Sequence, residues 1–403
     1  MNGWNLLRMR IMSRPRLWTR NFILNTTINF VIFIVYYLFM VIIAIHASEH
    51  LHASSSEAGL AAGIFILAAL PSRIFAGMMI EVIGRKRMLV IGSGIFLIAT
   101  LLYSKADCLF FLYIVRILHG IGWGIATTCT ATIIAYIIPD ERRGEGIGYY
   151  SMSNSLASSI GPLIGMNLYQ HVSFRAIIFL SIVLMVFIFL MLFFLKVPRA
   201  ELTREQIANM KGIAFRNFFE VKVLPIAVVG LVVYFSYSSI VSFLSSYAKE
   251  IHLIYAGSYF FVVYSAAILI SRMISGRLFD KKGENFVMYP SFLLFAIGLV
   301  TISQAENGFV LLLAGALMGV GFGTFASSSQ AIAIKLVSDH RKGLATSTFQ
   351  AISDMGIGIG PSILGFMIPV TGFRGLYVCM AGVVISAMFL YYFVYARAVK
   401  ELR

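Results

Sequence analysis

Asp354 is the acidic residue whose position most strongly indicates a chemical role. It is the twelfth residue of an apolar segment over 343–368, and it alone among the 17 Asp and Glu residues falls well inside such a segment. An ionised carboxylate at the middle of a bilayer costs about 2.5–3.5 kcal/mol on insertion scales. We therefore expect the side chain to face an interior cavity and to bind and release a proton there. The alternative is a structural carboxylate that is hydrogen-bonded to a neighbouring helix. The same helix face carries Ser347, Gln350 and Gly358.

Arg116 is the basic residue that we place well inside a predicted segment, seven residues from the start of 109–136, and we place no other there. At ~1.5 Å per residue it lies about 10 Å deep, too far for easy snorkelling. It needs a substrate anion, a backbone carbonyl or a carboxylate such as Asp354 as its partner. An Arg beside a titratable Asp would be a simple proton-coupling device, although a purely structural pairing is the alternative. His119, one turn later, is either a proton relay or a hydrogen-bonding core residue.

The segment His46-Ala-Ser-Glu49-His50 matches a metalloprotease pattern, with His52 close by. It lies at the end of an apolar segment, without a distant third ligand or a catalytic domain. We therefore expect an inert connection, or else an external proton antenna or weak metal site, and we predict no metal centre, no catalytic residues and no enzyme. An intramembrane metallohydrolase is the alternative from a different class of function.

Long apolar helices must position these residues. Hydrophobic residues make up 59% of the 403 residues and charged residues only 12%, which excludes an ordinary soluble globule. At ~20 residues per span, the chain has room for about twelve membrane-spanning helices. The apolar runs lack the period-2 alternation of strands, and they predict spans at 21–45, 58–80, 88–104, 109–136, 145–168, 174–196, 222–247, 256–279, 286–304, 309–335, 343–368 and 373–397.

The net charge of +15 would suggest nucleic acid in a soluble domain, but 25 of the 32 Lys and Arg fall in alternate connections and the two tails. The positive-inside rule therefore predicts that both ends are cytoplasmic, and we expect no nucleic-acid partner. The predicted organisation is a tail (1–20), a six-helix bundle (21–196), a cytoplasmic linker (197–221), a second six-helix bundle (222–398) and a short tail (399–403).

The two halves are related by a repeat with an offset of 199 residues. This offset aligns Pro71-Ser72-Arg73 with Ile270-Ser271-Arg272, and Gly161-Pro162 with Gly360-Pro361. It also places Asp354 opposite Ser155. Because six spans are an even number, the second copy has the topology of the first, which predicts two parallel bundles with a substrate path between them near the midplane.

Aromatic and polar residues recur near helical spacing on the first and seventh spans. Together with residues on other spans, they could line an aromatic cavity for an amphipathic substrate, although aromatic stripes are usually packing. The candidates are Asn29, Phe33, Tyr36, Tyr37, Trp123, Asn154, Tyr234, Phe235, Tyr237 and Gln350.

Three motifs resemble those of the major facilitator superfamily, and within it the twelve-span drug:proton antiporters. The first is Gly77-Met-Met-Ile-Glu81-Val-Ile-Gly84-Arg85-Lys86-Arg87, with a second copy at Gly276-Arg-Leu-Phe-Asp280-Lys-Lys-Gly283; Glu81 and Val82 depart from the usual Asp and Arg. The others are Arg116-Ile-Leu-His119-Gly120-Ile-Gly122 and Gly161-Pro162-Leu-Ile-Gly165, the last resembling a motif of exporters. A stretch around Asp354 also resembles one in bacterial drug and metallophore exporters.

The resemblance implies an all-α fold of two pseudo-symmetric six-helix bundles. It implies a conformational latch made of Gly77, Glu81, Gly84, Arg85, Arg87, Asp280 and Gly283, although charge that only sets the membrane topology is the alternative. Gly161, Pro162 and Gly165 are expected to allow a close contact and a bend at the boundary between the halves.

We expect proton-coupled export of a small amphipathic molecule across a bacterial plasma membrane by a functional monomer that lies in the lipid bilayer, with the proton as coupling ion and no other cofactor. The alternatives are an uptake symporter or facilitator, and a flippase for a lipid or glycolipid.

Overall fold

The structure is a computed structural model that describes residues 15–40, 42–197 and 218–397. The described residues form helices and connecting turns, without a β-strand, which confirms the predicted all-α class. The first half holds α2 (Arg20–Met40), α3 (Ile43–His50), α4 (Ser55–Ile83), α5 (Arg85–Leu102), η1 (Tyr103–Lys105), α6 (Leu109–Ile137), η2 (Asp140–Arg142), α7 (Arg143–His171) and α8 (Phe174–Phe194). The second half holds η3 (Val221–Val223), α11 (Leu224–Glu250), α12 (Ile254–Lys282), α13 (Glu284–Ser303), α14 (Gly308–Lys335), η4 (Asp339–Arg341), α15 (Lys342–Tyr391) and η5 (Tyr392–Ala396).

These helices follow the predicted spans in order. The first span comprises α2 and α3, and α15 contains both the eleventh and the twelfth, which are separated by Gly372 at a φ of 65°. Ten of the described segments are long and apolar enough to cross a membrane. The part of α15 before Ile363 and the whole of α7 are not among them. Both are rich in Gly and Ser, because they pack closely against other helices instead of presenting a fully apolar surface.

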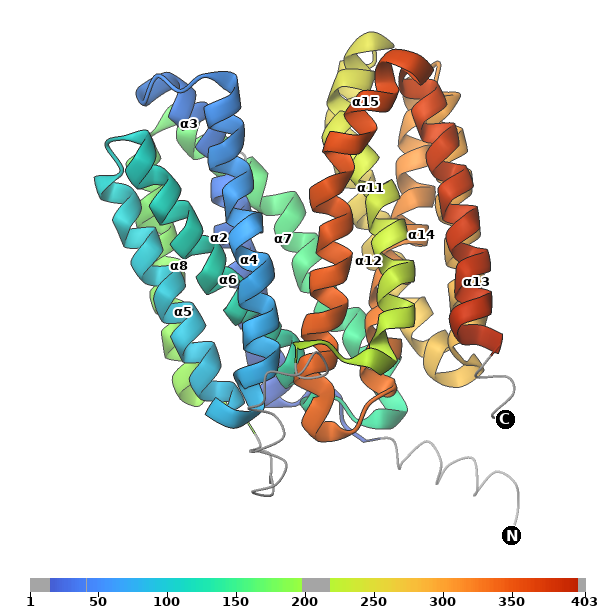
Figure 1. Cartoon of the computed structure of the whole chain (residues 1–403), viewed down its shortest axis with the longest axis horizontal. Coiled ribbons are helices and arrows are strands. Elements are labelled where there is room, and N and C mark those ends of the chain that lie inside the picture. The colour runs from blue at the N-terminus through green and yellow to red at the C-terminus, as the bar shows by residue number, and fades with distance from the viewer. Residues whose placement is uncertain (1–14, 41, 198–217, 398–403) are drawn as a thin grey trace.

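The helices form two bundles, α2–α8 and α11–α15, that meet at one end and diverge toward the other (Figure 1). The end where they meet carries the α4–α5 and α12–α13 turns. We name it the inner end, because the distribution of Lys and Arg predicts that it is cytoplasmic. Across the boundary α4 packs against α15, and α7 packs against α12. We name these contacts the α4–α15 seam and the α7–α12 seam. The 199-residue offset relates one to the other.

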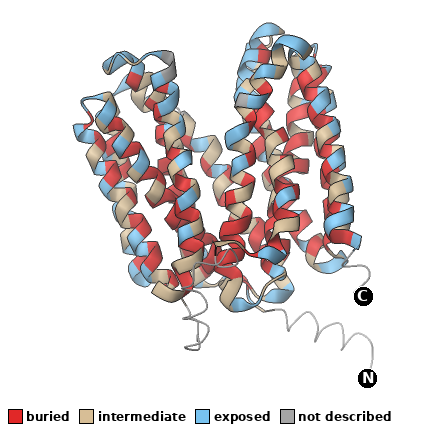
Figure 2. Cartoon of the chain, in the orientation of Figure 1, coloured by how far each residue is buried: buried red, intermediate tan, exposed pale blue. Residues whose placement is uncertain are grey.

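The apolar cores explain why the bundles meet at the inner end. One cluster of buried side chains lies entirely in the first bundle. The other fills the second bundle and also takes in Ile134, Ile147 and Tyr150 of the first. Figure 2 accordingly shows buried residues where the bundles meet at the inner end. The structure is therefore closed at that end.

Single glycines make the two inner turns. Gly84 joins α4 directly to α5 with a φ of 99°, and Gly283 joins α12 to α13 with a φ of 89°. Glycine adopts this left-handed backbone without the steric cost that other residues meet. These two latch candidates therefore act through backbone geometry.

Candidate functional site

Asp354 forms an ion pair across the α4–α15 seam. Its Oδ2 lies 3.0 Å from Nε of Arg73, and the side chains of Arg73 and Asp354 are 4% and 27% exposed. The pair joins the two bundles, because Arg73 belongs to α4 and Asp354 to α15. The carboxylate is thus partly exposed while its cation is buried.

Both bundles hold the Arg73 guanidinium. Nη1 donates to Oε1 of Gln350 at 2.8 Å and to Oγ1 of Thr127 at 3.1 Å. The guanidinium carbon lies 4.5 Å from the centroid of the Trp123 ring, within the range of a cation–π contact. Two predicted cavity residues, Trp123 and Gln350, are thereby placed beside Asp354.

Arg116 is not the one cation buried within the helices, and the prediction that it would be is wrong. Arg73 and Arg272 lie within helices and are 3% and 6% exposed. The signal that could have revealed them was the alignment of the two arginines at the 199-residue offset, together with the apolar residues around each.

Arg116 has backbone carbonyls as partners instead of Asp354. It donates from Nε to Ala61 O at 2.8 Å and from Nη2 to Ala62 O at 3.0 Å. Along α4 these carbonyls are 11 to 12 residues from Arg73, or about 17 Å at the helical rise. The pairing of Arg116 with Asp354 is therefore not formed, and of the three partners considered the carbonyl is the one observed.

His119 lies in the core of the first bundle. Its Nδ1 is 3.2 Å from the Tyr103 hydroxyl, its Nε2 is 3.4 Å from Thr100 Oγ1, and its ring stacks on Phe96 at 4.2 Å. Tyr103 also accepts a hydrogen bond from Arg116 at 3.3 Å. These contacts match the alternative of a hydrogen-bonding core residue, and none of them leads to Asp354.

Aromatic side chains from both bundles surround the pair. Tyr36 of α2 stacks on Trp123 with centroids 4.9 Å apart, and Tyr237 of α11 stacks on Phe322 of α14 at 3.9 Å. Tyr36 and Tyr234 each lie within electrostatic range of both Asp354 and Arg73. Phe322 is not among the residues that the sequence predicted for this cavity.

The remaining cavity candidates divide into two groups. Phe33, Tyr37, Asn154 and Phe235 are half-buried, and Tyr37 donates to Asn154 Oδ1 at 3.3 Å. Asn29 is only 1% exposed. Its Oδ1 accepts from Thr130 and Tyr150, each at 2.8 Å, and its Nδ2 donates to Ser153 at 2.9 Å. In this structure Asn29 therefore cross-links helices of the first bundle.

Asp280 caps the inner start of α7 across the bundle boundary. Its two carboxylate oxygens accept from the backbone N–H groups of Gly144 at 2.7 Å and Glu145 at 2.9 Å. A carboxylate at a helix N-terminus is stabilised by the orphan N–H groups and the helix dipole. Close approach at Gly276 permits this arrangement, because an added Cβ there would lie 2.7 Å from Gly144 O. Asp280 and Gly276 thus belong to the α7–α12 seam.

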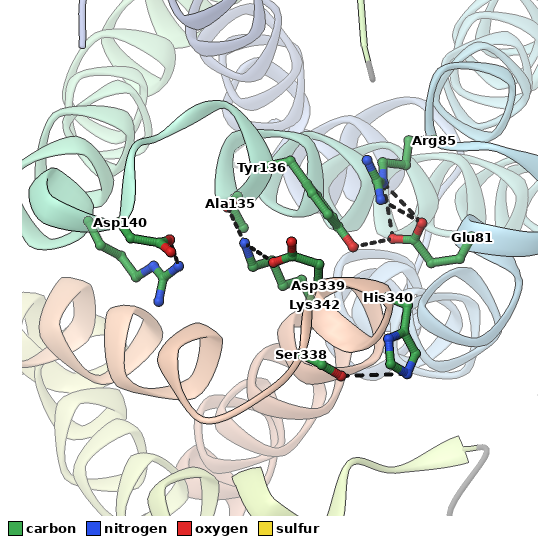
Figure 3. A network of polar contacts seen from close by, with 10 residues as sticks. Glu81, Arg85, Ala135, Tyr136, Asp140, Ser338, Asp339, His340 and Lys342 are labelled. Carbon is green, nitrogen blue, oxygen red and sulfur yellow. Dashed lines mark hydrogen bonds and ion pairs between the residues drawn. The ribbon is translucent and has the colours of Figure 1, made fainter. Parts of the chain in front are cut away.

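Glu81, the repeat counterpart of Asp280, has different partners. It accepts from Arg85 Nε at 3.0 Å and from the Tyr136 hydroxyl at 3.2 Å (Figure 3). Both partners belong to the first bundle. The cross-boundary contact here comes from Lys342, which donates to Ala135 O at 3.2 Å and pairs with Asp339 at 2.7 Å. This Lys342 ammonium lowers the pKa of the Asp339 carboxyl.

Two other latch candidates have distinct environments. Gly77 lies in the α4–α15 seam, where an added Cβ would meet the Ser347 side chain at 1.7 Å and Gly343 O at 3.2 Å. Arg87 is exposed. The inner closure thus depends on close backbone approach at Gly77 and Gly276.

Gly161 and Gly165 do not meet the other bundle. An added Cβ at Gly161 would meet Tyr37 Cβ at 2.5 Å, and one at Gly165 would meet Leu38 O at 2.8 Å. Both neighbours are on α2, so these glycines bring α7 close to a helix of its own half. The expected close helix contact is formed, but within the first bundle, so its placement at the boundary between the halves is wrong; Pro162 lies within the continuous helix α7.

The His46 cluster lies at the outer end. Glu49 Oε2 accepts from the Tyr169 hydroxyl at 2.8 Å, and the ring of His46 stacks on Phe174 at 3.8 Å. Among the described residues, no group of three or more His, Cys, Asp or Glu side chains could hold a metal ion.

Comparison with known proteins agrees with the fold of two helical bundles. The sequence profile of the Major Facilitator Superfamily matches residues 26–312 and 257–403, which together extend over most of the chain. The chain belongs to this superfamily. As a member it is a multi-span membrane transporter, and the family is not one of enzymes.

The relatives include an uncharacterized MFS-type transporter of Methanocaldococcus jannaschii, 25% identical over 83% of this chain and 88% of that protein. The multidrug resistance protein MdtG of Salmonella schwarzengrund is 26% identical over 80% of each chain. Among solved structures, the superfamily transporter FucP in the outward conformation has a TM-score of 0.74 and 16% identity, over 93% of this chain and 99% of that one. This likeness confirms the fold.

Proposed function

We propose that this superfamily member exports a small amphipathic molecule in exchange for protons by alternating access, and that Asp354 is the proton-coupling residue. The observation that carries the proposal is the ion pair of Asp354 with Arg73 across the α4–α15 seam. A titratable group that is paired between two moving bodies links its protonation to their separation. The likeness to a multidrug resistance protein supports export, and the membrane we propose is a bacterial plasma membrane with both chain ends in the cytoplasm.

The cycle follows from the charge of this pair. With Asp354 ionised, attraction to Arg73 stabilises the state closed at the inner end. A proton that enters from outside neutralises the carboxylate, removes this attraction and lets the seam open inward. Substrate binding near Asp354 then accompanies loss of the proton to the cytoplasm. Each charge that crosses 100 mV contributes about 2.3 kcal/mol, or roughly a fifty-fold concentration ratio.

The test is transport by Asp354→Asn in proteoliposomes with an imposed pH gradient. A growth screen of a deletion strain against a compound panel supplies the substrate. The variant should lose proton-driven accumulation while the purified protein keeps its helical content. Asp107→Asn, which removes an exposed carboxylate in an outer connection, is the matched control. Undiminished proton-driven transport by Asp354→Asn would rule out this role.

The same vesicles separate the alternatives. Equal rates in inside-out and right-side-out vesicles without a pH gradient would indicate a facilitator, and scrambling of labelled lipids by the purified protein would indicate a flippase. Hydrolytic activity that is lost in His46→Ala or His50→Ala would indicate the metallohydrolase.

A further inference from the structure

The Arg73–Asp354 pair has a counterpart in the α7–α12 seam. The 199-residue offset converts Arg73 into Arg272 and Asp354 into Ser155, and these two residues are also in contact: Arg272 Nη1 donates to Ser155 Oγ at 3.1 Å. The two seams therefore share one geometry. In one of them a carboxylate balances the arginine, whereas in the other a hydroxyl stands in its place.

Arg272 is consequently a buried cation without a carboxylate partner among the described residues. It is 6% exposed, and its Nε has no hydrogen-bond partner there. Its neighbours include Tyr264 and Tyr234, whose phenol groups are neutral and do not balance its charge. An unpaired charge inside a membrane protein is costly and is usually retained for function.

The position of Arg272 connects it to the transport path. Ser155 is on α7, Tyr234 on α11 and Arg272 on α12, so the guanidinium lies where helices of both bundles meet. Tyr234 is also within electrostatic range of Asp354 and Arg73. Because α7 and α12 belong to different bundles, opening of this seam separates Arg272 from Ser155 and uncovers the cation.

We propose that Arg272 binds an anionic group of the transported molecule, such as a carboxylate, sulfonate or phosphate. A planar guanidinium with a free Nε edge matches such groups, which accept two parallel hydrogen bonds. The stacked rings of Tyr237 and Phe322, which contact Tyr264 and Tyr234 respectively, offer an apolar surface for the remainder of the molecule. This inference rests on the proposed function only in that the chain carries a small amphipathic substrate; it does not depend on the coupling ion.

Two probes with one aromatic body test the site: 2-naphthoate and its neutral amide. Binding to the full chain in nanodiscs of zwitterionic lipid is measured by calorimetry, without any gradient. We expect 2-naphthoate to bind about tenfold more tightly than the amide, as for a charge-assisted hydrogen-bonded pair. Arg272→Gln should abolish this preference, whereas Lys105→Gln, which removes an exposed cation, should keep it.

Ser155→Asp gives a second test that leaves the arginine in place. The new carboxylate reproduces the Arg73–Asp354 arrangement and should occupy Arg272, so that the preference for 2-naphthoate disappears while the protein stays folded. Ser155→Ala should retain it. The inference is overturned if the wild-type chain binds the amide as tightly as 2-naphthoate, or if both Arg272→Gln and Ser155→Asp keep the preference. Since no proton gradient is used, failure of Asp354 as the coupling residue would leave this result unaffected.

Discussion

At the scale of single residues, Arg73 is a cation that side chains of both bundles bind. Thr127 and Trp123 hold its guanidinium from the first bundle, and Asp354 and Gln350 hold it from the second. When the seam opens, either the carboxylate or the guanidinium must find another partner. For the carboxylate, a proton is the partner that costs the least free energy, because it removes the charge altogether.

A double-mutant cycle measures this pairing. Arg73→Gln and Asp354→Asn should each lower the free energy of unfolding, because each leaves a charge without its partner. The double variant should be destabilised by less than the sum, with an interaction of about 0.5–3 kcal/mol. Thermal unfolding in detergent gives the three differences. Additive effects would show that the ion pair contributes nothing to the closed state.

At the scale of elements, the seams depend on helices that approach almost to backbone contact. Gly77 and Gly276 occupy equivalent positions in the two seams, and at each an added side chain would collide with the helix opposite. The caps on these seams differ. Asp280 bonds across the boundary to the start of α7, whereas Glu81 bonds within its own bundle.

Gly276→Leu should therefore prop the inner end open. Spin labels on Glu141 and Lys281, at exposed positions of the two bundles near this end, should report a longer distance distribution in the variant. The control is Gly94→Leu, since no atom lies within 4 Å of an added Cβ at Gly94. An unchanged distribution in Gly276→Leu would mean that the helices can absorb the side chain elsewhere.

The two acidic residues of the latch should also differ in effect. Asp280→Asn removes a charged cap of α7 and should shift the same distance distribution toward the open state by about 1 kcal/mol. Glu81→Gln should change it less, because its bonds to Arg85 and Tyr136 do not cross the boundary. Equal shifts in the two variants would contradict this asymmetry.

At the scale of the whole molecule, the described hydrogen bonds between the bundles extend from the inner end to about the middle of α7 and α12. The outermost hydrogen bond that joins the bundles in the described residues is between Ser159 of α7 and Ser265 of α12. Beyond it, toward the outer end, the bundles diverge (Figure 1). The molecule is thus closed at the inner end while its bundles lie apart at the other end, as one state of the proposed alternating-access cycle requires.

A disulfide at this hydrogen bond should arrest the cycle. Ser159→Cys combined with Ser265→Cys, in a chain whose natural cysteines are replaced by Ala, should lose transport on oxidation and regain it with reductant. Each single variant under the same oxidant is the control. Full transport by the oxidised double variant, with the cross-link verified by mass spectrometry, would show that α7 and α12 need not separate.

Much of this architecture was predictable, because patterns in the sequence itself indicate it. Apolar runs and the 199-residue offset are properties of the chain itself, and they led to the twelve spans and the paired bundles. The partners of Asp354 and Arg116 were not predictable in the same way. Arg73 and Arg116 are both cations in apolar helices, and the choice between them depends on where Thr127, Gln350 and the Ala61 carbonyl lie after packing. The alignment of Arg73 with Arg272 at the 199-residue offset was the one sequence signal that could have indicated the partner of Asp354.

The low hydropathy of α7 and of the first part of α15 has a consequence for how the protein inserts into the membrane. Neither α7 nor the first part of α15 is apolar enough to be recognised as a span on its own. As the nascent chain leaves the ribosome, each should therefore partition poorly into lipid as an isolated segment and should enter stably only beside α2 or α11, which it packs against. The helices that close the two seams would then insert stably only after their partners, so that their low hydropathy would set part of the order of assembly.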